Sequence, residues 1–159
     1  MSAVIDNVEI EEQLTDGFLV IGSGDLGDST VSLPGATNDV IYTSTFFASN
    51  DDIDAGFLDD VVNAGAGDDV INGGNGNDAL VGGTGEDTFV FEFFDNAQSD
   101  SILDFTLGED SIVIDGETVS DSFFIDNGIG DGELSVEISA DGDVTINGFE
   151  VDDDDFELL

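Results

Sequence analysis

The sequence predicts an all-β protein built as a β-solenoid, and three observations lead to that fold class. A unit rich in glycine and aspartate recurs every nine residues, short apolar runs alternate with turns, and no segment shows a sustained helical period. Glycine and aspartate are poor strand formers. Each unit nevertheless ends in three residues with an apolar one at the centre, which makes a minimal strand with one inward side chain. Stacked units of this kind form a coil with a continuous core.

The repeat is cleanest over residues 64–90, which hold three consecutive units. They read Ala-Gly-Ala-Gly-Asp-Asp-Val-Ile-Asn, Gly-Gly-Asn-Gly-Asn-Asp-Ala-Leu-Val and Gly-Gly-Thr-Gly-Glu-Asp-Thr-Phe-Val. We expect Ile71, Leu80 and Phe89, at the eighth place, to point inward. The apolar residue at this place argues against the alternative of a flexible acidic linker. Degenerate units precede the clean ones at residues 34–42, 46–54 and 55–63, with three extra residues after the first.

The pattern divides the chain into three zones. Residues 1–33 hold two apolar runs and a glycine-rich stretch, and are predicted to form an N-terminal β cap. Residues 34–90 form the repeat coil. Residues 91–159 lose the repeat and are predicted to form a C-terminal β cap, with a hairpin that turns at Asp141 and Gly142 and an acidic, then apolar, tail.

The charge balance excludes whole classes of function. The chain of 159 residues has 39 Asp and Glu and no Lys, Arg, His or Cys. No side chain can neutralise a phosphate, so we expect no nucleic-acid partner, and no apolar run is long enough for a membrane span. Catalytic triads, thiol chemistry, Schiff bases and zinc sites with nitrogen or sulfur ligands are impossible. We therefore expect no enzyme activity, although adjacent carboxylates such as Asp68 and Asp69 are a catalytic pair in principle.

The repeat itself favours a hard cation. Glycine permits positive φ and lets backbone carbonyls turn inward, while the aspartate at the sixth place supplies a short carboxylate close to them. Stacked carboxylates repel one another unless a cation lies between them. Calcium takes six to eight oxygen ligands, which carbonyls and aspartates can supply.

Residues 64–90 resemble the calcium-binding nonapeptide repeats of RTX proteins, the hemolysin-type family. The segments Asp87–Phe91, Asp100–Phe105 and Gly108–Ile112 resemble the region that follows the repeats in serralysin-type C-terminal domains. The resemblance implies a right-handed parallel β-roll with two nonapeptides per turn, in which calcium lies between units that are two apart.

The resemblance also implies ligand sets, in which carbonyls from the second and fourth places of one unit join carbonyls from the first and third places of the later unit. The first set is Gly65, Gly67 and Asp69 with Gly82, Thr84 and Asp87. The second is Gly56, Leu58 and Asp60 with Gly73, Asn75 and Asp78. A third pairs Asp51 with Asp69 through Phe47, Ser49, Ala64 and Ala66. Asp104 and Asp110 are expected to hold a separate calcium.

These sets imply two or more calcium ions. Leu58 and Phe47 stand where the family has residues that adopt a glycine conformation, so occupancy is expected to weaken toward the N-terminus.

The functional expectation is a protein that folds on binding calcium outside the cell. Members of the family leave Gram-negative cells through a type I secretion apparatus. The tail at residues 155–159 resembles its C-terminal signal, and residues 1–30 lack an ordinary signal peptide. The expected location is extracellular or at the cell surface, in a structural, matrix or surface-layer role with self-association into filaments or layers. Two alternatives stay open: a calcium-dependent adhesin or lectin, and a targeting domain detached from a larger RTX enzyme.

Overall fold

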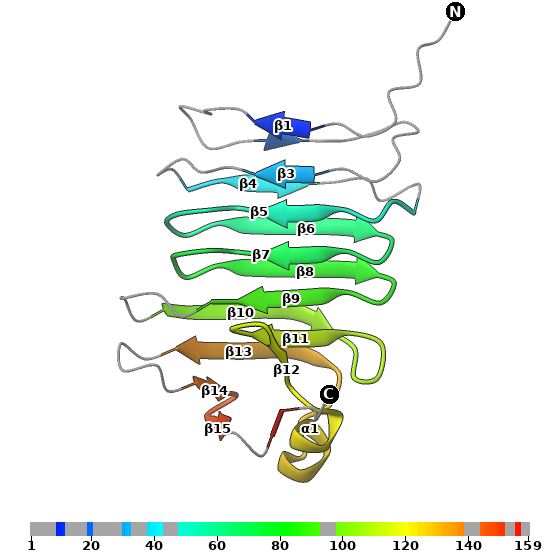
Figure 1. The fold of residues 1–159 in the computed structure, drawn as a ribbon, viewed down its shortest axis with the longest axis vertical. Coiled ribbons are helices and arrows are strands. Elements are labelled where there is room, and N and C mark those ends of the chain that lie inside the picture. The colour runs from blue at the N-terminus through cyan, green and yellow to red at the C-terminus, as the bar shows by residue number, and fades with distance from the viewer. Residues whose placement is uncertain are drawn as a thin grey trace, which may run out of the picture.

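The computed structural model describes residues 9–11, 19–20, 30–32, 38–42, 48–92, 98–138, 144–151 and 155–156. Within these residues the chain winds as a flattened coil whose strands alternate between two stacked sheets (Figure 1). The observed fold confirms the expected β-solenoid: it is mostly strand, with parallel pairing along the coil.

Over the residues that the structure describes, one sheet has seven strands and the other has eight. The seven-stranded sheet runs β1 (Glu9–Glu11), β3 (Thr30–Ser32), β5 (Asp52–Asp54), β7 (Val70–Asn72), β9 (Thr88–Phe91), β11 (Ser111–Ile114) and β12 (Glu117–Thr118). The eight-stranded sheet runs β2 (Leu19–Val20), β4 (Val40–Tyr42), β6 (Val61–Ala66), β8 (Ala79–Thr84), β10 (Gln98–Phe105), β13 (Gly132–Ile138), β14 (Val144–Ile146) and β15 (Phe149–Val151).

One turn of the coil takes two nonapeptides. Ile53 lies opposite Ile71, and Ile71 lies opposite Phe89, so consecutive partners are 18 residues apart. Ile41 lies opposite Val62, 21 residues further on, because the three extra residues found in the sequence lengthen that turn.

The core consists of two facing ladders of apolar side chains, one from each sheet. The predicted inward residues Ile71, Leu80 and Phe89 are all fully buried, which confirms the eighth place as the core position. Further buried members continue both ladders, and they are Val31, Ile41, Ile53, Val62, Ile102, Ile112, Leu134 and Ile146.

The parallel pairing extends into the predicted N-terminal cap. β1 pairs with β3, and β2 pairs with β4, both in parallel. Coil strands therefore lie within residues 1–33, ahead of the boundary expected at residue 34. A parallel strand needs only a short apolar triplet at the coil spacing, whereas the glycine repeat that guided the prediction shapes the loops between strands.

Antiparallel strands end both sheets at the C-terminal side. β12 pairs antiparallel with β11, while β13, β14 and β15 form an antiparallel meander on β10. The pairing of β13 with β14 confirms the predicted hairpin strands, and the turn at Asp141 and Gly142 lies outside the described residues.

A short helix, α1 (Asp121–Asn127), was not expected. It ends at Asn127 and is capped by Gly128, which has a left-handed φ of 69°. Phe123 and Phe124 of α1 are buried, and the ring of Phe124 lies 5.2 Å from that of Phe105 at the end of β10. The helix thus covers the C-terminal end of the core (Figure 1). Seven residues are too few for a periodic helical pattern to show in the sequence.

The described part of the C-terminal tail contacts this cap. The Ser120 backbone N–H donates to the Asp155 carbonyl at 2.8 Å, and Phe156 bridges to Val119 and packs against the core. The rest of the predicted secretion-type tail lies outside the described residues. Among the residues described, no helix is long and apolar enough to cross a bilayer.

Candidate metal centre

Buried aspartates line the coil at regular intervals. Each stands two residues before a buried apolar residue, so the pattern Asp-x-apolar repeats at the coil strands from β4 to β11. In the described part of the chain they are Asp39, Asp51, Asp60, Asp69, Asp78, Asp87, Asp100 and Asp110.

These aspartates form two ladders, one on each flank of the coil. On one flank Asp69 Oδ1 accepts the backbone N–H of Asp51 at 2.7 Å, and Asp87 Oδ1 accepts that of Asp69 at 3.0 Å. Asp110 extends this ladder by accepting the N–H of Asp87 at 3.1 Å. Asp60, Asp78 and Asp100 accept in the same way, each from the aspartate one turn earlier, at 2.6, 2.8 and 2.8 Å.

The second carboxylate oxygen has no such partner at three of these residues. Oδ2 of Asp60, Asp69 and Asp78 is buried without a hydrogen bond to any part of the chain that the structure describes. The sequence holds no Lys, Arg or His, so no side chain can neutralise them. A buried anion without a partner strongly destabilises a fold, and a cation at Oδ2 removes that penalty.

The pKa values follow from this environment. Burial raises the pKa of Asp60 to about 8, of Asp69 to about 7 and of Asp78 to about 6. Backbone N–H donors lower these pKa values in part, and neighbouring carboxylates raise them again. Without a cation, Asp60 therefore favours its protonated form at pH 7, and Asp69 and Asp78 hold their protons to a much higher pH than an ordinary aspartate does.

Carbonyl oxygens from one loop point at the next loop along the coil. A Cβ atom built on Gly83 would lie 1.9 Å from the Gly65 carbonyl oxygen, and one on Gly85 would lie 1.9 Å from that of Gly67. Both Gly83 and Gly85 also have positive φ values, of 108° and 136°. These positions therefore require glycine, and the second- and fourth-place carbonyls of the predicted first set face the later turn.

The other flank repeats this arrangement for the second set. The Gly56 and Leu58 carbonyl oxygens lie against Gly74 and Gly76, where an added Cβ would approach each to 2.1 Å. Asp78 Oδ2 lies over Gly73, the first residue of its own unit, at 2.4 Å from an added Cβ.

The predicted ligands at the first and third places of the later unit lie beside the carbonyls just described, in both sets. Asp87 Oδ2 covers Gly82, where an added Cβ would approach it to 2.3 Å. The Thr84 carbonyl accepts the Gly67 N–H at 2.9 Å, and the Asn75 N–H donates to the Gly56 carbonyl at 2.9 Å. A carbonyl oxygen has two lone pairs, so Thr84 and Gly56 each keep one for a metal.

The third predicted set is only partly visible. The Ser49 carbonyl oxygen lies against Gly67, and the Ser49 N–H donates to the Ala66 carbonyl at 2.8 Å. Ala64 is fully buried within β6. Phe47 lies outside the described residues.

Asp104 and Asp110, which were expected to hold a separate calcium together, have different hydrogen-bond partners. The Asp104 carboxylate accepts the N–H groups of Gly82 and Gly83, at 3.0 and 2.9 Å. Asp110 belongs to the aspartate ladder, and its Oδ2 accepts the Thr106 N–H at 2.8 Å. Both Asp110 oxygens are therefore engaged, and a separate calcium at Asp104 and Asp110 stays a prediction.

The donor set fits calcium. Two aspartates and four carbonyls offer six oxygens per site, the lower end of the calcium range. The described residues contain no cluster of three or more acidic side chains with metal-binding geometry. Sequence reasoning placed Asp39 in the degenerate unit 34–42 without assigning it as a ligand, and it missed Asp100 as a ladder member because the loop before it departs from the glycine pattern. The Asp-x-apolar pattern would have found both.

Leu58 carries backbone strain that can be tested. It holds the fourth place with φ of 74°, a left-handed conformation that costs a non-glycine residue about 1–2 kcal/mol. Its side chain is half exposed, so Leu58→Gly loses little apolar burial. We expect this variant to raise stability by about 1 kcal/mol, measured as a higher melting temperature in saturating calcium. The control Leu103→Gly, at an equally exposed strand position of ordinary φ, should lower it, and a lower melting temperature for Leu58→Gly would contradict the argument.

Comparison with known proteins agrees with this geometry. Residues 54–89 match the family model of the RTX calcium-binding nonapeptide repeat, which spans four copies. The match includes the degenerate unit that contains Leu58. Searches of curated proteins and of solved structures gave no match. Residues 54–89 of this chain are thus RTX calcium-binding nonapeptide repeats.

Proposed function

We propose that this chain is a secreted calcium-binding protein that folds when calcium fills its aspartate ladders outside the cell. The proposed ligands are Asp69 and Asp87 with the carbonyls of Gly65, Gly67, Gly82 and Thr84, and Asp60 and Asp78 with those of Gly56, Leu58, Gly73 and Asn75. A third site uses Asp51 and Asp69. Bound calcium supplies positive charge and coordination to oxygens that the chain cannot otherwise satisfy.

One observation carries the proposal: three buried carboxylate oxygens without partners in a chain whose formal net charge is −39. Self-repulsion at that charge opposes a compact state, and the unpaired burial adds to it. Because an unfolded chain has no preformed site, the free energy of calcium binding becomes free energy of folding.

The location follows from calcium availability. Extracellular calcium-binding modules have dissociation constants of about 10⁻⁴–10⁻³ M, far above the calcium level of a cytosol. A chain with such sites stays unfolded, and competent for a type I secretion channel, until it leaves the cell. Its expected place is the exterior or surface of a Gram-negative bacterium, in a structural, matrix or surface-layer role.

Circular dichroism tests the folding step. Calcium-free protein at pH 7.5 should give the spectrum of an unfolded chain, and calcium in the range of about 0.1–1 mM should produce a β-rich spectrum that a chelator reverses. Magnesium serves as the control, because its preference for small octahedral sites with bound water suits these carbonyl loops poorly. A β-rich spectrum without calcium at this pH would refute the proposal.

Self-association is the part of the proposal that sedimentation tests. The described strands β1 and β2 end the two sheets at the N-terminal side, and unpaired parallel strands are open to pairing with another copy. At the other end α1 covers the core. We therefore propose that two copies pair through their N-terminal ends. If the protein at high concentration sediments as a monomer in calcium, the proposed self-association is wrong.

A further inference from the structure

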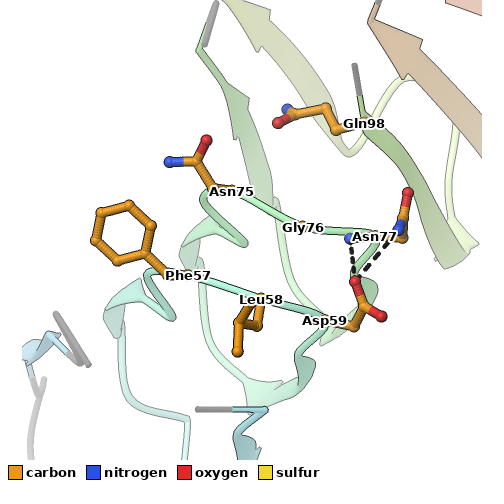
Figure 2. Close-up of a pocket in the computed structure, with 7 residues that line it drawn as sticks. All are labelled: Phe57, Leu58, Asp59, Asn75, Gly76, Asn77 and Gln98. Carbon is orange, nitrogen blue, oxygen red and sulfur yellow. Dashed lines mark hydrogen bonds between the residues drawn. The ribbon is translucent and has the colours of Figure 1, made fainter. Parts of the chain in front are cut away.

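A cleft of about 300 Å³ opens on the flank where loops lead from the seven-stranded to the eight-stranded sheet. Its walls come from two consecutive glycine loops and from the first residue of β10 (Figure 2). The lining residues are Phe57, Leu58, Asp59, Asn75, Gly76, Asn77 and Gln98. The inward aspartates of this flank, Asp60, Asp78 and Asp100, are not among them. The cleft adjoins the second proposed calcium set, to which Leu58 and Asn75 supply backbone carbonyls, whereas the groups that the cleft offers to a ligand are side chains.

One wall of the cleft is held rigid by hydrogen bonds. Asp59 Oδ1 accepts both the backbone N–H of Asn77 at 2.9 Å and its side-chain amide at 3.2 Å. Asn77 Oδ1 in turn accepts the Ser99 N–H at 3.1 Å. Figure 2 shows this hydrogen-bonded pair on one side and Phe57 and Asn75 on the other. The Asp59 and Asn77 side chains of this wall are thus already engaged in hydrogen bonds within the chain.

Two other carboxamides are not committed. Gln98 is 6% exposed, and its Oε1 is buried without a hydrogen bond to the described residues. Its side chain extends from β10 in the direction of Asn75 (Figure 2). The Asn75 carboxamide forms no side-chain hydrogen bond within the part of the chain that the structure describes. An acceptor left unpaired inside a cleft is a place where a ligand hydroxyl can donate.

The remaining wall is apolar and open. Phe57 and Leu58 are each 48% exposed, on a loop whose neighbours are mostly glycine, asparagine and aspartate. An aromatic face beside carboxamides suits a ring that has an apolar face of C–H groups and polar hydroxyls at its edges. The chain has no Lys, Arg or His, so the cleft offers nothing to an anion, and a purely apolar ligand would leave Gln98 Oε1 unpaired.

We propose that this cleft binds a neutral saccharide unit. One face of the sugar ring packs on Phe57, a hydroxyl donates to Gln98 Oε1, and a ring or hydroxyl oxygen accepts from the Asn75 amide. A second divalent cation is the competing occupant. It is disfavoured because Asp59 is the sole carboxylate of the lining and its Oδ1 already accepts two hydrogen bonds.

The test is nuclear magnetic resonance on the folded ¹⁵N-labelled full chain, in whichever buffer gives the β-rich spectrum. Glucose, galactose, mannose and N-acetylglucosamine are titrated separately while the side-chain amide signals of Gln98 and Asn75 are followed. At least one of these sugars should shift both signals with a dissociation constant of about 1 mM, which is typical of a small, shallow site. The inference concerns the folded coil, so its result is distinguishable from the result of the calcium-folding test.

Matched variants locate the binding. Phe57→Ala should weaken it by about tenfold or more, whereas Phe149→Ala, which removes a similarly exposed phenylalanine from β15, should leave it unchanged. Gln98→Leu should also weaken binding, because it removes the acceptor Oε1. If this variant does not give the folded spectrum, Asn75→Ala takes its place, with weaker binding again the expected result. No shift with any of the four sugars, equal binding by both phenylalanine variants, or a shift of the same signals by added calcium after folding is complete would each overturn the proposal.

Discussion

Asp69→Asn raises the calcium concentration that half-folds the chain by about tenfold or more, because calcium affinity depends on the number of charged ligands. Asp69 lies between Asp51 and Asp87 in its ladder, so the substitution affects the proposed sites on both sides of it. Asparagine keeps an oxygen that can accept the Asp51 N–H. What it removes is the charge at the buried Oδ2.

The neighbouring residue provides the matched control. Asp68→Asn makes the same change of charge one position earlier, at an exposed side chain whose Oδ1 accepts the Glu86 N–H. An asparagine oxygen can accept that bond too, so the half-folding calcium concentration should change by less than about twofold, as expected for a screened surface charge. Calcium titrations followed by circular dichroism compare the two variants. Equal shifts would mean that net charge, and not coordination at Asp69, controls folding.

The regular part of the coil could be predicted because its information is local. A nine-residue register fixes which residue points inward, so Ile71, Leu80 and Phe89 are buried as expected. The C-terminal cap could not be predicted to the same extent. The helix α1 exists because Phe123 and Phe124 cover the open end of the core, and that need arises only when the coil is already stacked.

The candidate site also has a part that the local repeat predicts and a part that it does not. Its glycines were identified from the repeat, and the close approach of Gly65 oxygen to Gly83 gives the physical reason for them. Asp100 was missed because it follows a turn of 22 residues, as the pairing of Leu80 with Ile102 shows, and not one of 18. The ladder tolerates such a change in loop length, because the hydrogen bond from the Asp78 N–H to Asp100 depends on strand pairing and not on the loop sequence.

Mild acid should fold the calcium-free chain. Burial raises the pKa of Asp60 to about 8, of Asp69 and Asp100 to about 7, and of Asp78 and Asp87 to about 6, from an ordinary value of 3.8. Between about pH 4 and pH 8 the folded coil therefore binds more protons than the unfolded chain, and its free energy of unfolding falls as the pH rises. We expect calcium-stripped protein to be unfolded at pH 7.5 and to gain a β-rich spectrum by about pH 5, with no further gain below about pH 4, where the unfolded carboxylates also protonate.

Two controls separate this linkage from a general loss of charge. The triple variant D60N/D69N/D78N removes three of the titrating groups, so its β signal should change less between pH 7.5 and pH 5. The double variant D59N/D68N removes outer carboxylates and should keep most of the slope of the unsubstituted chain, because burial, and not these neighbouring charges, is the largest cause of the raised pKa values. With calcium present, the pH dependence of folding should have the opposite sign. Protons compete with the metal for the same oxygens, so the calcium concentration needed for folding rises as the pH falls. Protein must be stripped of calcium beforehand, since a carboxylate chelator is itself protonated in acid. A calcium-free spectrum that does not change between pH 7.5 and pH 5 would show that the ladder aspartates do not oppose folding.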